Sequence, residues 1–290
     1  MSRWEAVDIP DQTGRIFVVT GANGGLGAVT ARALAAKGAQ VIMACRDLAK
    51  AERVAADLGS RADVRSLDLA DLSSVRAFAA GIDRVDVLIN NAGVMAVPKR
   101  RTADGFEMQV GTNHLGHFAL TGLLLDKIAD RVVTVSSGAH TVGKIDLNDL
   151  NWERRRYRRW LAYGQAKLAN LMFAYELQRR LTAAGSPILS VAAHPGYAAT
   201  DLQSHTESFM DSFMAVGNRL LAQSAENGAL PQLFAATEPV EPGAFYGPDT
   251  FGGMRGHPAR CGSTKASRDE TVARELFALS ERLTGVTYSI

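Results

Sequence analysis

Short runs of apolar, often β-branched residues alternate along this chain with longer stretches rich in alanine and leucine. Seven runs predict strands, the last more weakly than the others: 15–20, 40–45, 63–69, 86–90, 131–137, 188–194 and 244–247. Stretches between them, such as 27–38 and 72–82, carry apolar residues three and four positions apart, which is typical of helices. Strands that alternate with helices build a parallel sheet covered on both faces. The pattern therefore predicts an α/β fold with a doubly wound, mostly parallel, seven-stranded sheet.

The alternation weakens in the last third of the chain. Residues 203–243 carry few strand signals, 247–263 predict a glycine-rich loop, and a final helix is expected over about 266–283. No proline-rich or low-complexity linker interrupts the earlier part, so we expect a single domain over 1–290. Within it, residues 203–263 are expected to form a cap or loop over the substrate.

Segment 206–223 places apolar side chains near helical spacing. Two interpretations stay open: a helix that covers the core, or a methionine-bearing lid over an apolar substrate.

Composition excludes several classes of protein. Hydrophobic residues make up 47% of the 290 residues, which is too many for a disordered chain. The 32 basic and 30 acidic residues nearly balance, so no global field favours nucleic acid or an anionic membrane. Cys45 and Cys261 lie far apart and fit neither a disulfide framework nor a zinc site. The chain shows no secretory h-region and no apolar run of membrane-spanning length. We therefore expect a cytoplasmic protein without a membrane span.

The sequence "TGANGGLG" at 20–27 follows the first predicted strand and opens the first helix. Glycines in such a loop allow a tight turn and let backbone N–H groups approach a pyrophosphate at the helix N-terminus. A glycine triplet alone could be a simple turn, but its place between strand and helix favours a Rossmann-type nucleotide site. We assign these residues to cofactor binding: Gly21, Asn23, Gly25, Leu26 and Gly27.

The residues after the second and third strands predict the choice of cofactor. Cys45 stands where NAD-binding units usually carry an acid, and Arg46 follows it. Because a guanidinium suits a phosphate, Arg46 favours NADP(H) over NAD(H). Asp47 is expected to cap the next helix. Asp68 could accept a hydrogen bond from adenine or cap a helix, and Leu69 beside it is assigned to the same site.

Tyr163 and Lys167 lie four positions apart, so they share one face of a predicted helix over about 161–181. A free phenol, with a pKa near 10, is a poor acid–base group at neutral pH. A cation about 4 Å away, at an effective dielectric near 20, is worth roughly 4 kcal/mol and could lower that pKa by up to about three units. Desolvation opposes the shift. Tyr163 is therefore expected to act as a general acid or base.

Other polar motifs follow the strands and should collect with this pair at the carboxyl edge of the sheet, where open α/β folds bind ligands. They are "NNAG" at 90–93, the serine pair at 136–137 and "PGYAATDL" at 195–202. Because strand side chains alternate, Ser136 and Ser137 should face opposite sides, although strand ends can bulge.

Together with "GTNHLGHF" and "YGQAK", these motifs resemble the short-chain dehydrogenase/reductase family, over roughly residues 15–205. The sequence that flanks these motifs is most similar to that of retinol-dehydrogenase-like members. The resemblance implies that Tyr163 exchanges the proton, Lys167 lowers its pKa and binds the nicotinamide ribose, Ser137 orients the substrate oxygen, and Asn113 holds a relay water. Because the strand end can bulge, Ser136 remains the runner-up to Ser137. Asn113 could instead make a cap or a buried backbone contact. The resemblance also implies further cofactor contacts: Asn90, Ala92, Gly93, Pro195, Gly196 and Thr200.

A long insertion, 144–160, separates Ser137 from Tyr163, as in retinol-dehydrogenase-like members. Its "ERRRYRR" run at 153–159 could bind an anionic substrate, a membrane surface or a partner, but such runs more often form a solvated face. The aromatic residues of the insertion are expected to pin it to the body of the protein: Trp152, Tyr157 and Trp160.

These observations predict an NADP(H)-dependent oxidoreductase that interconverts an alcohol and a carbonyl on an apolar substrate. Reduction of a carbon–carbon double bond, as in protochlorophyllide reductases, and a non-catalytic NADP sensor are the alternatives. His114 and His117 have a spacing compatible with a metal, but no third ligand accompanies them, so we expect packing roles and no metal. The resemblance makes a homodimer or homotetramer plausible.

Overall fold

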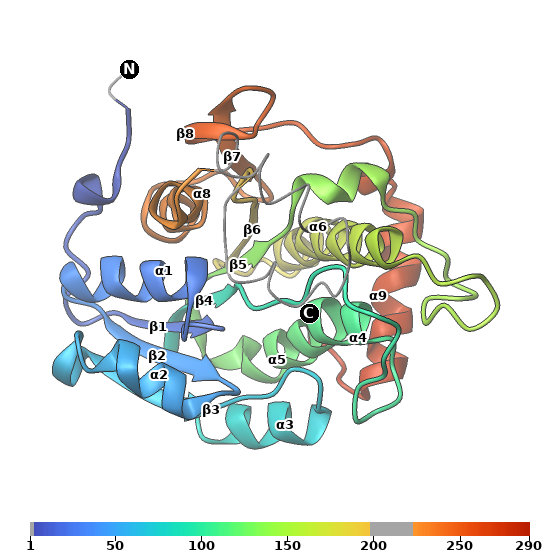
Figure 1. Ribbon diagram of the computed structural model, residues 1–290, viewed down its shortest axis with the longest axis horizontal. Coiled ribbons are helices and arrows are strands. Elements are labelled where there is room, and N and C mark those ends of the chain that lie inside the picture. Colours follow the sequence, from blue (N-terminus) through green and yellow to red (C-terminus); the bar gives the residue numbers. More distant parts are fainter. Residues whose placement is uncertain (1–2, 198–222) are drawn as a thin grey trace.

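Eight strands form one sheet within residues 3–197 and 223–290, the parts of the chain that the computed structural model describes (Figure 1). The order across the sheet is β3-β2-β1-β4-β5-β6-β7-β8. The strands are β1 (Ile16–Thr20), β2 (Gln40–Cys45), β3 (Ala62–Ser66), β4 (Val85–Asn90), β5 (Ile128–Val135), β6 (Leu189–Ala193), β7 (Phe245–Thr250) and β8 (Arg255–Arg260). The first seven run parallel, which confirms the doubly wound α/β fold.

The eighth strand corrects the prediction of a glycine-rich loop at 247–263. β7 continues to Thr250, turns, and pairs antiparallel with β8, with Tyr246 opposite Arg260. The segment carries no apolar run because β8 lies at the sheet edge and is only partly buried. An edge strand also tolerates Pro258, because proline lacks the N–H that a central strand must donate.

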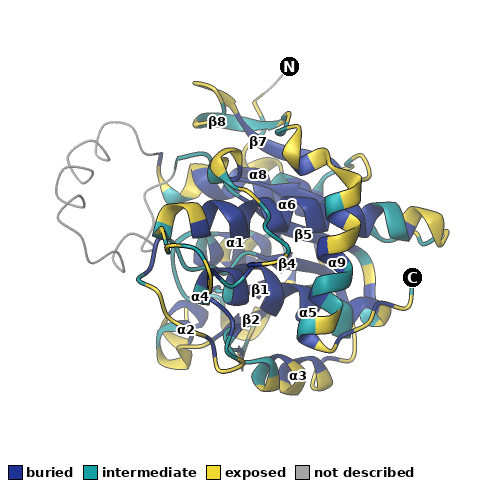
Figure 2. Ribbon diagram, turned by 90° about the vertical axis from the view of Figure 1, so that its right-hand side faces the viewer, coloured by how far each residue is buried: buried dark blue, intermediate teal, exposed yellow. Residues whose placement is uncertain are grey.

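Helices cover both faces of the sheet (Figure 1). One layer contains α1 (Gly25–Ala36), α2 (Leu48–Ala55) and α8 (Ala225–Thr237); the other contains α3 (Leu72–Ala80), α5 (Gly116–Leu124), α6 (Arg159–Ala183) and α9 (Glu270–Thr284). Phe17 and Val19 of β1 face the first layer and Val18 faces the second, all three with no solvent exposure. Figure 2 shows this buried centre between the two layers. Burial on both sides explains why the strands read as continuous apolar runs.

Side-chain caps fix where several helices begin. The Asp47 carboxylate accepts a hydrogen bond from Lys50 N at 2.9 Å, which confirms its predicted capping role. Asp71 caps α3 and Asp269 caps α9 in the same way. A short α4 (Met108–Val110) and a π-helical turn, η3 (Gly111–Leu115), lead into α5 and carry Asn113.

Two predicted features lie outside the described residues. Thr200 is one, and the segment at 206–223 is the other, apart from Gln223 at its end. Gln223 donates to the carbonyl of Pro195 at 2.6 Å, so the described chain resumes beside the end of β6.

Candidate active site

Ser137, Tyr163 and Lys167 meet at the carboxyl edge of the sheet. α6 brings Lys167 Nζ to 5.8 Å from the centroid of the Tyr163 ring, and the same ammonium donates to Val135 O at 3.0 Å. The Ser137 hydroxyl lies beside the Tyr163 phenol, close enough to favour its ionised form. Tyr163 and Lys167 are both buried. The structure thus brings together three of the residues that the sequence assigned to catalysis.

The two serines at the end of β5 have separate partners. Ser136 Oγ donates to Lys167 O at 2.8 Å and is buried, so it faces the backbone of α6. Ser137 begins the 3-10 helix η5 (Gly138–Val142), where its hydroxyl accepts from Ala139 N at 3.2 Å. The alternation of the strand therefore continues through this pair, and the bulge that would have favoured Ser136 is not seen there.

Burial shifts the pKa values of the tyrosine and the lysine in opposite directions. It raises the pKa of Tyr163 to about 12, against the opposing effect of the nearby Ser137 hydroxyl. It also lowers the pKa of Lys167 to about 8. Our expectation that Lys167 would lower the pKa of the phenol is wrong for this structure, because the cost of burying a phenolate is the larger effect.

Asn113 lies buried on η3 and clamps the loop that follows β4. Its Oδ1 accepts from Val94 N at 2.8 Å, and its Nδ2 donates to Val94 O at 2.9 Å. Gly93 lies between this amide and the lysine: a Cβ placed on it would be 3.1 Å from Asn113 Oδ1 and 3.7 Å from Lys167 Nζ. The side chain of Asn113 therefore makes the backbone contact that the sequence left as an alternative, next to Lys167.

The glycine loop fits a pyrophosphate. Gly21 has a φ of 67°, a left-handed conformation that suits glycine, and its N–H donates to Ala44 O at 2.8 Å. A Cβ on Gly27 would collide with the carbonyl of Gly21. α1 then starts at Gly25 without a side-chain cap, so no capping side chain occupies its first N–H groups. A dinucleotide phosphate is the group that such an N-terminus binds.

The remaining loop residues contribute in different ways. Asn23 is partly buried in the turn, whereas Leu26 packs its side chain against the core beside α1. Ala92 approaches Gly21, where a Cβ would be 3.0 Å from the Ala92 Cβ. Asn90 points elsewhere: its Nδ2 donates to Thr121 on α5 at 2.9 Å, and the residue is fully buried. The Asn90 side chain therefore ties the end of β4 to α5 within the protein interior.

Two residues missed by the sequence reasoning hold these loops together. Thr20 Oγ1 accepts from the N–H of Asn91 and of Ala92, each at 2.9 Å, and Asn91 Nδ2 donates to Thr20 O at 2.8 Å. The glycine loop and "NNAG" are therefore one interlocked unit. Both residues lie inside the quoted motifs, so the signal that could have found them was present.

At the end of β2, Cys45 is buried, and burial raises the pKa of its thiol to about 11, so the position carries no charge at neutral pH. Arg46 next to it is exposed. Asp68 Oδ1 accepts from Ala70 N at 2.9 Å, a local turn, whereas Asp71 caps α3; the capping interpretation of Asp68 was therefore wrong. Leu69 is buried against α5.

Pro195 and Gly196 follow β6. The N–H of Gly196 donates to His194 Nδ1 at 3.2 Å, and a Cβ on Gly196 would collide with the carbonyl of Met254, in the turn that joins β7 to β8. The β7–β8 pair, of which the sequence predicted only the start of β7, thus supports this edge of the candidate site.

The aromatic residues of the insertion divide into two groups. Trp152 is buried, and Tyr157 donates to Glu107 Oε1 at 2.9 Å, so both pin the insertion as expected. Trp160 is 38% exposed, and its ring centroid lies 6.3 Å from that of Tyr163 in an edge-on contact. Trp160 is therefore exposed to solvent and contacts the ring of Tyr163, which the sequence did not predict.

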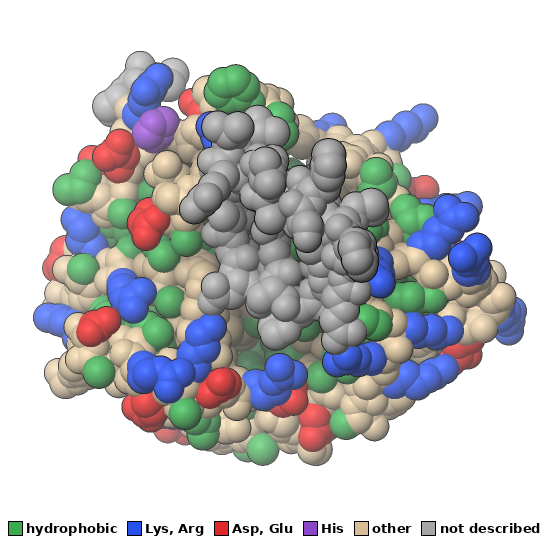
Figure 3. Space-filling model, in the orientation of Figure 1, with side chains coloured by type: hydrophobic (Ala, Val, Ile, Leu, Met, Phe, Trp, Pro, Cys, Tyr) green, Lys and Arg blue, Asp and Glu red, His purple; other side chains and the backbone are tan. Residues whose placement is uncertain are grey.

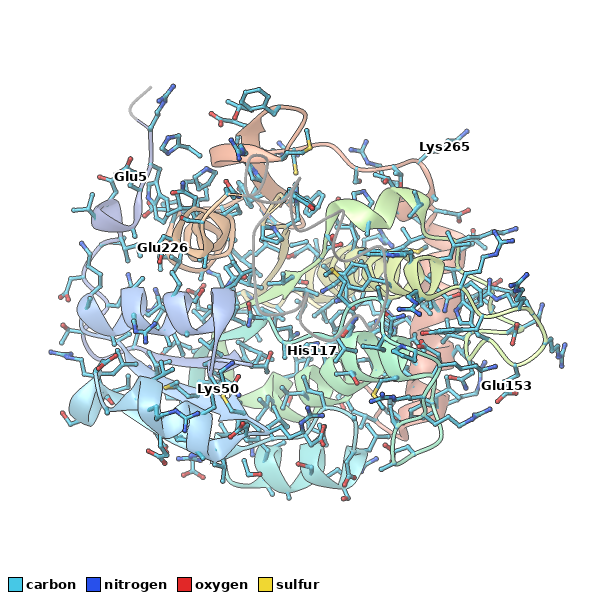
Figure 4. The ribbon with its side chains drawn as sticks, in the orientation of Figure 1. Glu5, Lys50, His117, Glu153, Glu226 and Lys265 are labelled. Atoms are coloured by element: carbon cyan, nitrogen blue, oxygen red, sulfur yellow. The ribbon has the colours of Figure 1, made fainter. Side chains whose placement is uncertain are left out.

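The basic run of the insertion is largely exposed. Arg154, Arg156 and Arg158 are open to solvent, whereas Arg155 packs over the Trp152 ring at 3.7 Å. Figure 3 shows Lys and Arg side chains gathered on the side of the molecule where Figure 4 labels Glu153. This distribution fits a solvated face.

The described residues contain no group of three His, Cys, Asp or Glu side chains that could bind a metal ion. His114 Nε2 instead contacts Ser280 Oγ at 2.9 Å. Across residues 3–197 and 223–290, no helix is both long and apolar enough to cross a membrane.

Comparisons with known proteins show the family to which this chain belongs. The model of the short chain dehydrogenase family matches residues 15–211. Human retinol dehydrogenase 13 is 44% identical, covering 94% of this chain and 85% of that protein. Mouse polyprenol dehydrogenase is 39% identical, covering 96% and 86%. A crystal structure of an uncharacterized protein from Mycobacterium paratuberculosis is 52% identical over 100% of both chains, with a TM-score of 0.88.

The chain belongs to the short-chain dehydrogenase family. It is an oxidoreductase of the kind that uses a nicotinamide dinucleotide, NAD(H) or NADP(H), and it resembles the retinol dehydrogenases.

Proposed function

We propose that this protein is an NADP(H)-dependent oxidoreductase that interconverts a lipid-like alcohol and its aldehyde or ketone. The observation that carries the proposal is the placement of Ser137 and Lys167 beside Tyr163, next to a glycine loop that fits a dinucleotide. A phenol placed in this way is suited to give a proton to a carbonyl oxygen or, as the phenolate, to take one from an alcohol oxygen.

The chain's own residues account for the proton half of the reaction. During reduction Tyr163 would give its proton to the substrate oxygen, and Ser137 would hold that oxygen by a hydrogen bond. During alcohol oxidation the same proton returns to Tyr163. Bound NADP(H) would supply or accept the hydride at the substrate carbon. Lys167, held by Val135 O, would bind the nicotinamide ribose.

Two features support NADP(H) over NAD(H). The buried thiol of Cys45 stands at the end of β2, where a carboxylate would repel a 2′-phosphate. The exposed guanidinium of Arg46 is the adjacent cation. Together they favour a phosphate on the adenosine ribose.

A lipid-like substrate is supported by the relatives and by the surface near Tyr163. The relatives are named for retinol and polyprenol, which are long apolar alcohols. Val142, Trp160 and Leu161 are all exposed apolar residues on the two elements that carry Ser137 and Tyr163. Of residues 203–263, expected as a cap, the described part forms α8, β7 and β8. The protein would act in the cytoplasm.

The test is turnover of NADPH and of NADH with retinal, a polyprenal, short aldehydes and an enone, with each product identified by mass spectrometry. We expect alcohol to form from the long aldehydes with NADPH. Reduction of the enone at its carbon–carbon bond alone would favour the double-bond alternative. Cofactor binding without turnover of any member would favour the sensor and overturn the proposal.

A further inference from the structure

His117 is a buried histidine that the proposed reaction does not use. It lies on α5, one turn after Asn113, and Figure 4 labels it in the interior of the molecule. Its Nδ1 is 3.0 Å from the backbone carbonyl of Asn113, and its Nε2 is 2.9 Å from Thr20 Oγ1. One ring therefore joins the asparagine of the candidate site to the strand that opens the cofactor loop.

The hydrogen bonds determine the tautomer of His117. A carbonyl oxygen can only accept, so Nδ1 must carry the proton and Nε2 of the neutral ring must be an acceptor. Thr20 has a single hydroxyl proton to donate. Its hydroxyl oxygen already accepts hydrogen bonds from the N–H groups of Asn91 and Ala92. The carbonyl of Ile89 is 3.4 Å from this hydroxyl, farther than His117 Nε2, so the proton goes to the ring.

The neutral form is also the one that the surroundings favour. Burial lowers the pKa of His117 to about 4, and the charge of Lys167 acts in the same direction. His114, the other titratable group beside it, is itself held neutral by burial. A second proton would place an N–H against Thr20, whose oxygen already accepts two.

These contacts brace both ends of one loop. The Thr20 hydroxyl accepts hydrogen bonds from the backbone of Asn91 and Ala92. The side-chain amide of Asn113 hydrogen-bonds both the N–H and the carbonyl of Val94. Between them lies Gly93, where a Cβ would be 3.7 Å from Lys167 Nζ.

We propose that His117 is a positioning residue for proton transfer: as the neutral Nδ1–H tautomer it fixes the carbonyl of Asn113 and, through Thr20, the loop 91–94. This keeps Asn113 in register with Lys167. The kinetic part of this inference rests on the proposed function, whereas the tautomer can be measured without any substrate.

The first test is two-dimensional NMR of protein labelled with ¹⁵N-histidine, with the His117 signals assigned by their loss in His117→Asn. The expected result at pH 6 is a neutral ring protonated at Nδ1. A neutral ring protonated at Nε2, or a doubly protonated ring, would overturn the inference even if the protein proved to have no turnover.

The second test compares three variants over a pH series. Asn can reproduce the Nδ1 donor toward Asn113, Gln can reproduce the Nε2 acceptor toward Thr20, and Leu reproduces neither. We expect His117→Leu to lower kcat about 10- to 100-fold, the cost of a small misplacement, with little change in the Kd of NADPH. His117→Asn should recover most of that loss and His117→Gln less.

His114→Leu is the matched control, because it removes an equally buried histidine whose partner is Ser280 on α9. It should reduce stability as much as His117→Leu does but leave kcat within about threefold, a difference of under 1 kcal/mol. Equal losses of kcat in His117→Asn and His117→Leu, or in His114→Leu and His117→Leu, would contradict a positioning role.

Discussion

Ser136 Oγ donates a hydrogen bond to the backbone carbonyl of Lys167 at 2.8 Å. This contact ties the end of β5 to the turn of α6 that carries the lysine. The next residue, Ser137, lies beside the phenol of Tyr163, which is one turn before Lys167 on α6. The serine, tyrosine and lysine of the candidate site therefore lie where the end of β5 meets α6.

The two serines should respond differently to substitution. Ser137→Ala removes a hydrogen bond at the reacting oxygen and should lower kcat about 100- to 1,000-fold. It also removes the cap on Ala139 N, which should lower the free energy of unfolding by about 1 kcal/mol. Ser136→Ala removes a buried bond to a carbonyl and should lower the free energy of unfolding by about 1–3 kcal/mol. Steady-state kinetics and urea unfolding of both variants check this. Equal kinetic losses would show that the pair was assigned wrongly.

Arg46→Ala should weaken NADPH binding about tenfold or more and leave NADH binding unchanged, because it removes a charge-assisted contact to the 2′-phosphate. The Kd values for both cofactors can be measured by fluorescence titration. Arg32→Ala is the control, since Arg32 is also exposed but pairs with Asp57 at 3.4 Å. An unchanged ratio of the two Kd values in Arg46→Ala would refute the assignment.

Stability should fall in mild acid because four histidines, His114, His117, His140 and His194, are buried and burial lowers the pKa of each. Burial lowers the pKa of His114 to about 3 and those of His117 and His194 to about 4. Below about pH 6.5 these histidines bind protons in the unfolded chain but stay neutral in the folded chain. The contribution of these histidines to the free energy of unfolding should therefore be fully present above about pH 6.5. It should fall by up to about 1.4 kcal/mol per pH unit per histidine as the pH approaches 4.

Urea unfolding at pH 7, 6 and 5 measures this slope. His114→Gln should make it shallower by about the contribution of one histidine. A stability that does not change between pH 7 and 5 would show that these side chains are not buried as neutral rings.

Trp160→Ala should reduce kcat/KM for a long apolar aldehyde about tenfold and for a short aldehyde much less, because a longer chain can cover the indole beside Tyr163. The Kd of NADPH should not change. Trp4→Ala is the control, since Trp4 packs against Phe234 of α8. A loss that is the same for long and short aldehydes would argue against substrate contact.

The sequence predicted what depends on local pattern. Buried strands such as β2 appear as apolar runs, and Asp47 precedes a helix that it can cap, so both were found. β8 was missed because a partly buried edge strand with Pro258 carries no apolar run. The raised pKa of Tyr163 was missed because desolvation depends on the whole fold around it. The exposure of Trp160 depends likewise on how the insertion folds back.

The most direct test of the proposed chemistry is reduction of retinal by NADPH with the wild type and with Tyr163→Phe, alongside the Kd of NADPH for each. Tyr163→Phe keeps the ring, its packing and its contact with Trp160, and removes only the hydroxyl. If Tyr163 transfers the proton, kcat should fall about 100- to 10,000-fold while the Kd stays the same. Turnover by Tyr163→Phe within a few-fold of the wild type would contradict the account.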